Sequence, residues 1–312
     1  MNRQPLVSVV VVTYHSSATV LETLESIRAQ SYGNIELIVS DDASRDDTVE
    51  KVRGWLEVHA SAFFATNVLS ASGNGGIPAN CNRGLAAASG VYVKLIAGDD
   101  LLTADCIAFD VGQIGDDSIL CTGMSCKRAA GISSLPPSDI RNTQLFFALP
   151  THEQFRSYIR NPVFLNTPTF FFKRSLFDLI GNFDERIRLL EDQPFICRAL
   201  AQGERIRYAD HVTVLYRVSE GSTMGGQSRA FLRCLLQCFW LYRLPYLRWY
   251  SLPEVLLVVE SGCLQLLLTR ALYHPVLITW FKKCCPSRIF LESGFKTHMA
   301  ALLFRGNPKL KT

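Results

Sequence analysis

The segment 7–12, VSVVVV, constrains the fold of this chain more than any other feature. It is β-branched and almost continuously apolar, which is typical of a parallel strand with helices over both faces. Segment 18–30 then repeats apolar residues at helical spacing, and segment 35–40 is again strand-like. A strand, a helix and a second strand in this order predict an α/β fold with a parallel sheet.

Two pairs of carboxylates, Asp41-Asp42 and Asp99-Asp100, come directly after predicted strands. In open α/β sheets, ligands bind in the crevice outside the carboxyl ends of the strands. Adjacent carboxylates there form a hard oxygen site that suits Mg²⁺ or Mn²⁺ bound to a diphosphate, although acid pairs are also common in solvated loops. We therefore expect a metal-assisted nucleotide site at this edge of the sheet.

Asp42 has two compatible interpretations. Its carboxylate can accept a hydrogen bond from a base or from a ribose hydroxyl, with Tyr14 covering the base. It can also cap the helix predicted at 46–58, a duty that Ser44 would share. The chain contains neither GxxxxGK[ST] nor GxGxxG, so neither a P-loop nor a Rossmann dinucleotide site is supported.

The alternation of elements continues further along the chain. Helices are predicted at 77–89, 152–160 and 189–203, strands at 91–96, 169–173 and 205–216, and a mobile connection at 130–150. Glu191 and Asp192 lie in the helix at 189–203, where acids commonly serve only the helix dipole. The phenylalanines at 170–172 are expected in the core of a strand rather than in contact with a ligand.

Charge divides the chain into two parts. Residues 226–312 carry 12 Lys and Arg against three acids, a net of +9, whereas residues 1–225 carry 20 against 25, a net of −5. The acidic part argues against nucleic-acid binding, and the basic, apolar part suits an anionic membrane surface or a lipid-borne diphosphate. Residues 252–281 come nearest to a membrane span, but charged and polar residues interrupt them, so interfacial helices are favoured.

Three tryptophans, Trp240, Trp249 and Trp280, would lie at that membrane interface. An equal alternative is that the C-terminal helices pack on the main domain or on a second subunit, as in a homodimer. The ten cysteines show no paired CxxC spacing, so a zinc site is not expected. The first residues lack a secretory signal, so we expect a cytoplasmic protein with free thiols.

Five motifs follow one another between about residues 6 and 222: VSVVVVTYHSSATVLETLESIRAQSY, IELIVSDDASRDDT, NGGIPANCNRGLAAASGVYVKLIAGDD, GNFDERIRLLEDQPFICRALAQG and VLYRVSEGS. In this order they resemble the family 2 glycosyltransferases, inverting enzymes with a GT-A fold. The resemblance implies a GT-A domain over residues 1–225 and a mainly helical C-terminal extension over residues 226–312.

The resemblance also implies a role for each matching residue. Contacts to the nucleotide or the rest of the donor are implied for Thr13, Tyr14, Asp42, Asn82, Asp99 and Arg217. Asp100, together with Asp99, would hold Mg²⁺ or Mn²⁺. Asp192 would be the general base, with Glu191, Thr167 and Thr169 on the acceptor side. A carboxylate that takes the acceptor's proton typically contributes about 10² to 10⁴ in rate.

Departures from the family pattern keep a second reading open. Cys81 stands where many members carry Arg, and Ser219 replaces a His of the last motif. A GT-A-like module that binds a nucleotide sugar or a partner enzyme without catalysis would tolerate both changes. The retained aspartates favour the enzyme, whereas a nucleotidyltransferase would need a Gly-rich phosphate loop that the chain lacks.

The hypothesis is therefore a glycosyltransferase on the inner face of the cell membrane. It would move a sugar from a nucleotide diphosphate donor, expected to be UDP-linked, to a lipid-linked glycan or an oligosaccharide. Such a reaction serves the assembly of surface polysaccharides such as capsule or lipopolysaccharide.

Overall fold

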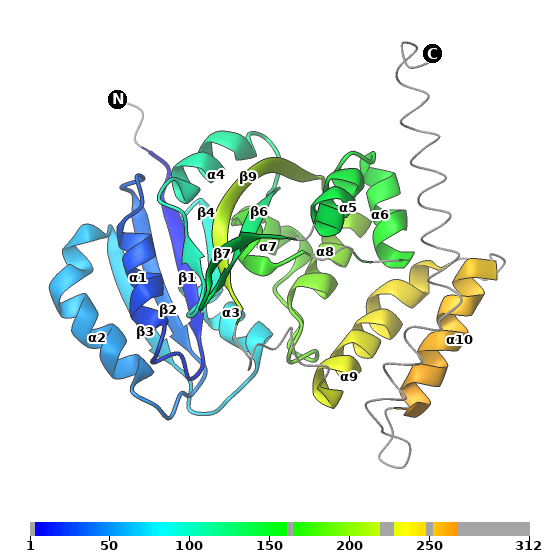
Figure 1. Cartoon of the computed structure of the whole chain (residues 1–312), viewed down its shortest axis with the longest axis horizontal. Coiled ribbons are helices and arrows are strands. Elements are labelled where there is room, and N and C mark those ends of the chain that lie inside the picture. The colour runs from blue at the N-terminus through cyan, green and yellow to red at the C-terminus, as the bar shows by residue number, and fades with distance from the viewer. Residues whose placement is uncertain are drawn as a thin grey trace, which may run out of the picture.

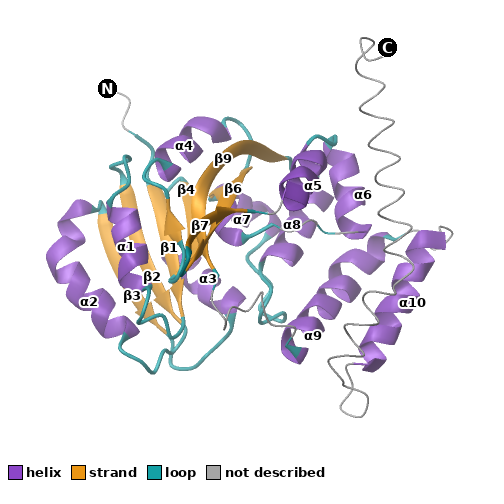
Figure 2. Ribbon diagram, in the orientation of Figure 1, coloured by secondary structure: helices purple, strands orange, loops and turns teal. Residues whose placement is uncertain are grey.

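A mixed sheet with helices on both faces forms the centre of the molecule (Figures 1 and 2). The structure is a computed structural model, and it describes residues 4–135, 137–160, 162, 165–218, 228–247 and 252–267. Nine strands of this described part form the sheet, in the order β3-β2-β1-β4-β8-β6-β9-β5, with β7 paired to β6. The prediction of an α/β fold is confirmed.

The first half of the sheet is parallel. Its strands are β1 (Val7–Thr13), β2 (Ile35–Asp41), β3 (Ala65–Ser70) and β4 (Tyr92–Ala97). β1 lies between β2 and β4, and β2 also pairs with β3. β3 was not predicted, because its sequence ATNVLS lacks an apolar run. β3 lies at the edge of the sheet, and all its residues are at least partly exposed.

The second half of the sheet is mixed. It contains β5 (Leu101–Leu102), β6 (Ile119–Arg128), β7 (Gly131–Ser134), β8 (Phe170–Lys173) and β9 (Ile206–Arg217). β8 joins the two halves, because it pairs antiparallel with both β4 and β6. All three phenylalanines of β8 are buried, which confirms that they belong to the core.

Each face of the sheet has its own apolar core. One core lies under α1 (Val20–Arg28), α2 (Thr48–His59) and α4 (Cys106–Ile114). The other lies under α3 (Ile77–Ala87), α5 (Pro137–Phe147), α6 (Thr151–Arg160), α7 (Ser175–Ile180) and α8 (Asp192–Ala201). β1 alternates between these cores, with Val10 facing one and Val9 and Val11 facing the other.

The prediction of a mobile connection at 130–150 is wrong. This stretch forms β7 and α5, and α5 is anchored by Phe146, which is fully buried. Pro137 is the first residue of α5, a position that proline tolerates well.

The described C-terminal residues are helical. They comprise α9 (Arg229–Cys238), a π-helical turn (Phe239–Arg243), a 3₁₀ turn (Leu244–Tyr246) and α10 (Leu252–Leu267). Cys234 and Cys238 of α9 share a buried cluster with Ile187 and Leu190, so α9 packs on the loop between α7 and α8. No helix among the described residues is long and apolar enough to cross a bilayer. Trp249 and Trp280 lie outside the described residues.

Candidate active site

The carboxyl ends of the parallel strands β1, β2 and β4 lie at the same edge of the sheet. This places the two acid pairs at one edge, as predicted from the sequence. Thr13, at the end of β1, donates its hydroxyl to Asp41 Oδ1 at 2.8 Å. The backbone N–H of Asp42 donates to the carbonyl of Thr13 at 3.0 Å. Gly98 allows the end of β4 to approach β1, because a Cβ there would lie 2.7 Å from Thr13 Cγ2. Thr13, Asp41 and Asp42 are therefore held together.

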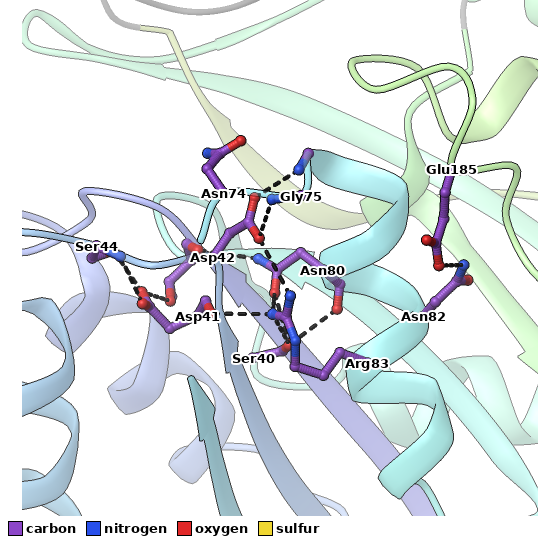
Figure 3. Close-up of polar contacts among 12 residues, drawn as sticks. Ser40, Asp41, Asp42, Ser44, Asn74, Gly75, Asn80, Asn82, Arg83 and Glu185 are labelled. Atoms are coloured by element: carbon purple, nitrogen blue, oxygen red, sulfur yellow. Dashed lines mark hydrogen bonds and ion pairs between the residues drawn. The ribbon is translucent and has the colours of Figure 1, made fainter. Parts of the chain in front are cut away.

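Asp42 organises the loop before α3 (Figure 3). Its Oδ1 accepts from the N–H of Gly75 at 2.9 Å, and its Oδ2 accepts from the N–H of Gly76 at 2.8 Å. The expected capping of α2 by Asp42 is not seen, because Asp46 accepts from the N–H of Thr48 instead. Asp42 thus fixes the loop at Gly75 and Gly76 beside the end of β2.

The loop held by Asp42 also contacts the segment that leads to α8. Gly76 has φ 96° and ψ 171°, and a Cβ there would lie 2.6 Å from the carbonyl oxygen of Arg188. The N–H of Ile77 donates to that same carbonyl at 2.9 Å. The Arg188 guanidinium in turn donates to Asn74. These contacts connect the end of β2 to the acids at the start of α8.

Arg83 is a site residue that sequence analysis missed (Figure 3). Its guanidinium lies 3.3 Å from Asp42 Oδ1 and donates to the carbonyl of Asp41 at 3.1 Å. Cys81, which stands where many family members carry Arg, is buried in the core. The spacing of Gly76, Asn80 and Arg83 could have revealed the role of Arg83, because residues four and seven apart share a helix face.

Asn82 lies on another side of α3 (Figure 3). Its amide donates to the carbonyl of Phe183 at 2.9 Å and to Glu185 at 2.8 Å, and its oxygen accepts from the N–H of Phe183 at 3.0 Å. Its contacts therefore hold the loop between α7 and α8, whereas Asn80 and Arg83 lie beside Asp42.

Asp100 is a buried carboxylate with one unused oxygen. It is 1% exposed, its Oδ1 accepts from the backbone N–H of Arg217 at 2.8 Å, and its Oδ2 has no partner within the described structure. Burial, and then the neighbouring Asp99, raises the pKa of Asp100 to about 8. Burial also raises the pKa of Asp99. A divalent cation would compensate both effects, so these residues fit the predicted metal.

In the described part of the chain, Asp99 and Asp100 offer a metal ion few protein ligands. Among the described residues, no cluster of three or more His, Cys, Asp or Glu side chains could hold an ion. A metal at Asp99 and Asp100 would therefore take its other ligands from phosphate oxygens or water, as Mg²⁺ sites often do.

Arg217 lies at the end of β9, next to both aspartates. Its Nε donates to the carbonyl of Asp99 at 2.8 Å, and its Nη2 pairs with Glu22 Oε2 at 2.7 Å. Glu22 also pairs with Lys127 at 2.6 Å. The guanidinium is thus directed toward α1, and a diphosphate would have to compete with Glu22 for it.

The second acid pair lies at the start of α8. Glu191 Oε1 accepts from the Thr167 hydroxyl at 2.7 Å, which brings two predicted acceptor-side residues together. Burial raises the pKa of Glu191. Burial, and then the charge of Glu191, raises the pKa of Asp192 strongly. The hydroxyl of Thr169 instead donates to the carbonyl of Asn166, inside the core.

The C-terminal region supports the loop in front of this acid pair. The Tyr242 hydroxyl donates to Asp184 Oδ2 at 2.5 Å, and Arg186 makes a salt bridge to the same carboxylate at 2.8 Å. The hydrogen bonds from Arg186 lower the pKa of Asp184 to about 2. Burial opposes this shift, and the hydrogen bond from Tyr242 adds to it. Tyr242, in the π-helical turn, therefore holds the loop at Asp184 in place.

Tyr14 is the predicted site residue with the most exposed side chain, at 50%. It lies just beyond β1, and its ring contacts His15 with 4.2 Å between centroids. His15 has φ 52° and Ala43 has φ 64°, both unusual for residues other than glycine. Such conformations cluster at functional sites, and these two residues come shortly after β1 and β2, which end at Thr13 and Asp41.

Solved structures share this fold. TarS from S. aureus, in complex with UDP-GlcNAc, matches with a TM-score of 0.57 and 19% identity over 83% of this chain and 81% of that one. The mannosyltransferase PcManGT from Pyrobaculum calidifontis, in complex with GDP-Man and Mn²⁺, gives a TM-score of 0.60 and 20% identity over 98% and 80%. The fold is therefore the GT-A fold, as predicted.

The sequence comparisons identify the family of GT-A proteins to which the chain belongs. The model of glycosyl transferase family 2 matches residues 8–180, and the chain belongs to this family. An uncharacterized glycosyltransferase, EpsJ of Bacillus subtilis, is 24% identical over 220 residues, or 70% of this chain. The match spans 62% of EpsJ, less than two thirds of its length.

Proposed function

We propose that this protein is an inverting glycosyltransferase that uses a nucleotide diphosphate sugar. The donor is UDP-linked, and the acceptor is a hydroxyl group of a lipid-linked glycan or an oligosaccharide in surface polysaccharide assembly. Family membership supports sugar transfer, and the UDP-GlcNAc complex of TarS supports a UDP donor. The GDP-Man complex of PcManGT makes GDP the nucleotide to test beside it.

The unpartnered Oδ2 of Asp100 is the observation that carries the proposal. A buried carboxylate oxygen without a partner is costly, and a bound ion that uses the oxygen would explain it. Asp99 and Asp100 would hold Mg²⁺ or Mn²⁺, and the ion would neutralise charge on the departing diphosphate. Thr13, Tyr14, Asp42 and Arg83 would surround the base and ribose.

Asp192 is the proposed general base. Its raised pKa makes its carboxylate a stronger proton acceptor than that of an ordinary aspartate. It takes the proton of the acceptor hydroxyl while that oxygen forms a bond to the anomeric carbon. The bond from this carbon to the diphosphate oxygen breaks, and its electron pair leaves with the diphosphate. A single in-line displacement inverts the anomeric centre.

Glu191 and Thr167 are proposed to position the acceptor. Their mutual hydrogen bond fixes Glu191 beside Asp192, so the acceptor hydroxyl would meet two carboxylates with different environments. Peripheral attachment to the inner membrane face is part of the proposal, and it rests on the basic composition of residues 226–312.

Calorimetric titration with UDP and with GDP, each with and without Mn²⁺, tests the donor site. We expect metal-dependent binding of UDP that Asp100→Asn weakens and Asp192→Asn preserves. A panel of nucleotide sugars is then scored for nucleotide release, which Asp192→Asn should abolish. The exposed Asp178→Asn on α7 is the matched control.

The outcomes separate the candidate functions. Undiminished turnover by Asp192→Asn would refute the assignment of the base. Nucleotide binding without turnover of any sugar would favour the binding module, which the Cys81 departure suggested. No binding of either nucleotide would refute the donor site.

A further inference from the structure

A cleft at the end of α8 opposite Asp192 has no part in the proposed transfer. Its volume is about 610 Å³, and it lies between α6, the last turn of α8 and the turn at Tyr246. The described residues that line it are Thr151, His152, Phe155, Arg156, Ile159, Arg160, Leu200, Ala201, Gly203 and Tyr246. Across the ten residues of α8, at about 1.5 Å per residue, the cleft lies roughly 14 Å from Asp192.

The wall of the cleft formed by α6 carries two arginines and a histidine. His152, Arg156 and Arg160 are four residues apart, so they share one face of the helix. No carboxylate occurs among the described lining residues. The nearest acid in sequence, Glu153, follows His152 and lies 3.9 Å from its ring, outside the set that lines the cleft. The described lining of the cleft, with Arg156 and Arg160 on one helix face, is therefore complementary to an anion.

Apolar groups line the rest of the cleft. Phe155 and Tyr246 meet edge to face with 5.0 Å between ring centroids. Ile159 and Leu200 are buried beside them. A free phosphate would leave this apolar surface unused, whereas an amphiphile with an anionic head would cover it.

The wall formed by α6 is held rigidly in place. Arg243 donates from Nε to the carbonyl of Ile159 at 2.7 Å and from Nη2 to the carbonyl of Arg160 at 2.6 Å. Gln154 donates to the carbonyl of Leu149 at 3.1 Å, just before α6. Both ends of α6 are thus fixed, and a ligand would not have to order the helix before binding.

We propose that this cleft binds the phosphate of an anionic membrane lipid. The phosphate lies against His152, Arg156 and Arg160, and the glycerol and first methylenes of the lipid lie against Phe155 and Tyr246. Bound in this way, the main domain itself contacts the membrane and holds the start of α8 at a set distance from its surface. The site is separate from the proposed donor site.

Vesicle flotation of the full chain tests the proposal. The vesicles are phosphatidylcholine alone or phosphatidylcholine with phosphatidylglycerol. Arg156→Glu should lower partitioning to the anionic vesicles by about tenfold or more, because each basic residue near such a surface adds about fivefold. The control is Arg53→Glu, which makes the same charge change at an exposed position of α2 and should preserve binding.

A second variant tests the apolar half of the site. Tyr246→Ser should weaken vesicle binding without changing the net charge. Inorganic pyrophosphate is added as a competitor to distinguish a lipid from a soluble anion. Competition by pyrophosphate together with unchanged binding of Tyr246→Ser would identify a soluble anion as the occupant and overturn the proposal.

Two further outcomes decide the matter. Equal losses in Arg156→Glu and Arg53→Glu would show a response to net charge alone, and unchanged partitioning of Arg156→Glu would show that the cleft is not used; either overturns the proposal. UDP titration of Arg156→Glu is expected to match the parent. A failure of membrane binding is therefore distinguishable from a failure of the proposed transferase function.

Discussion

A fully buried ion pair should make this protein sensitive to the loss of either charged partner. Lys94 Nζ of β4 lies 2.8 Å from Asp110 Oδ2 of α4, and both side chains are 0% exposed. Burial alone would lower the pKa of Lys94, but the Asp110 carboxylate outweighs it and raises that pKa. The lysine is therefore charged, and its charge depends on Asp110.

Asp110→Asn is expected to lower the free energy of unfolding by about 3–5 kcal/mol, because it leaves a buried ammonium group without its counter-charge. Lys94→Met should cost a similar amount by isolating the carboxylate. The double variant Lys94→Met/Asp110→Leu should be less destabilised than either single variant, since an apolar pair of similar volume needs no charge compensation. A loss of this size is a large fraction of a typical total of about 5–15 kcal/mol.

Urea-induced unfolding at pH 7, followed by far-UV circular dichroism, gives the four free energies of this double-mutant cycle. The exposed pair Lys51–Asp47, with 3.1 Å between Nζ and Oδ2, is the control. Asp47→Asn should leave the unfolding midpoint unchanged. The reasoning is refuted if Asp110→Asn behaves like this control, or if the two single losses simply add in the double variant.

Two further variants test the proposed donor site. Asp100→Asn should raise the melting temperature of the metal-free protein at pH 8 and leave it unchanged near pH 4. The pKa of Asp100 is about 8 in the folded state, against a usual value of 3.8. Between these two pH values only the folded state keeps the Asp100 carboxyl protonated, so the parent protein loses stability as the pH rises through this range. An equal difference at both pH values would contradict this. Gly76→Ala should lower the free energy of unfolding by about 1–3 kcal/mol or more, because its backbone conformation suits only glycine and Arg188 lies against it. Gly54→Ala, within α2 and with open space around it, should instead stabilise by about 0.5–1 kcal/mol, and a similar response to both substitutions would exclude strain as the cause.

Much of the first half of the fold could be predicted from sequence. The strands at 7–12, 35–40 and 91–96 carry a continuous β-branched or apolar signal, because parallel strands are buried on both faces. Their order placed both acid pairs at the carboxyl edge of the sheet. Where a segment buries few side chains, as in β3 and α5, the signal was too weak to reveal the element.

The sequence by itself determined the family and the residue types available for chemistry, because these depend on local patterns and on the order of motifs. Only the tertiary structure decided which groups meet. It brings Arg83 to Asp42 and turns Asn82 toward Phe183 and Glu185, although the two residues are neighbours on one helix. It also directs Arg217 to Glu22 and packs α9 against the loop before Asp192. These pairings join residues far apart in the chain, so they follow from how helices and strands pack rather than from any local propensity.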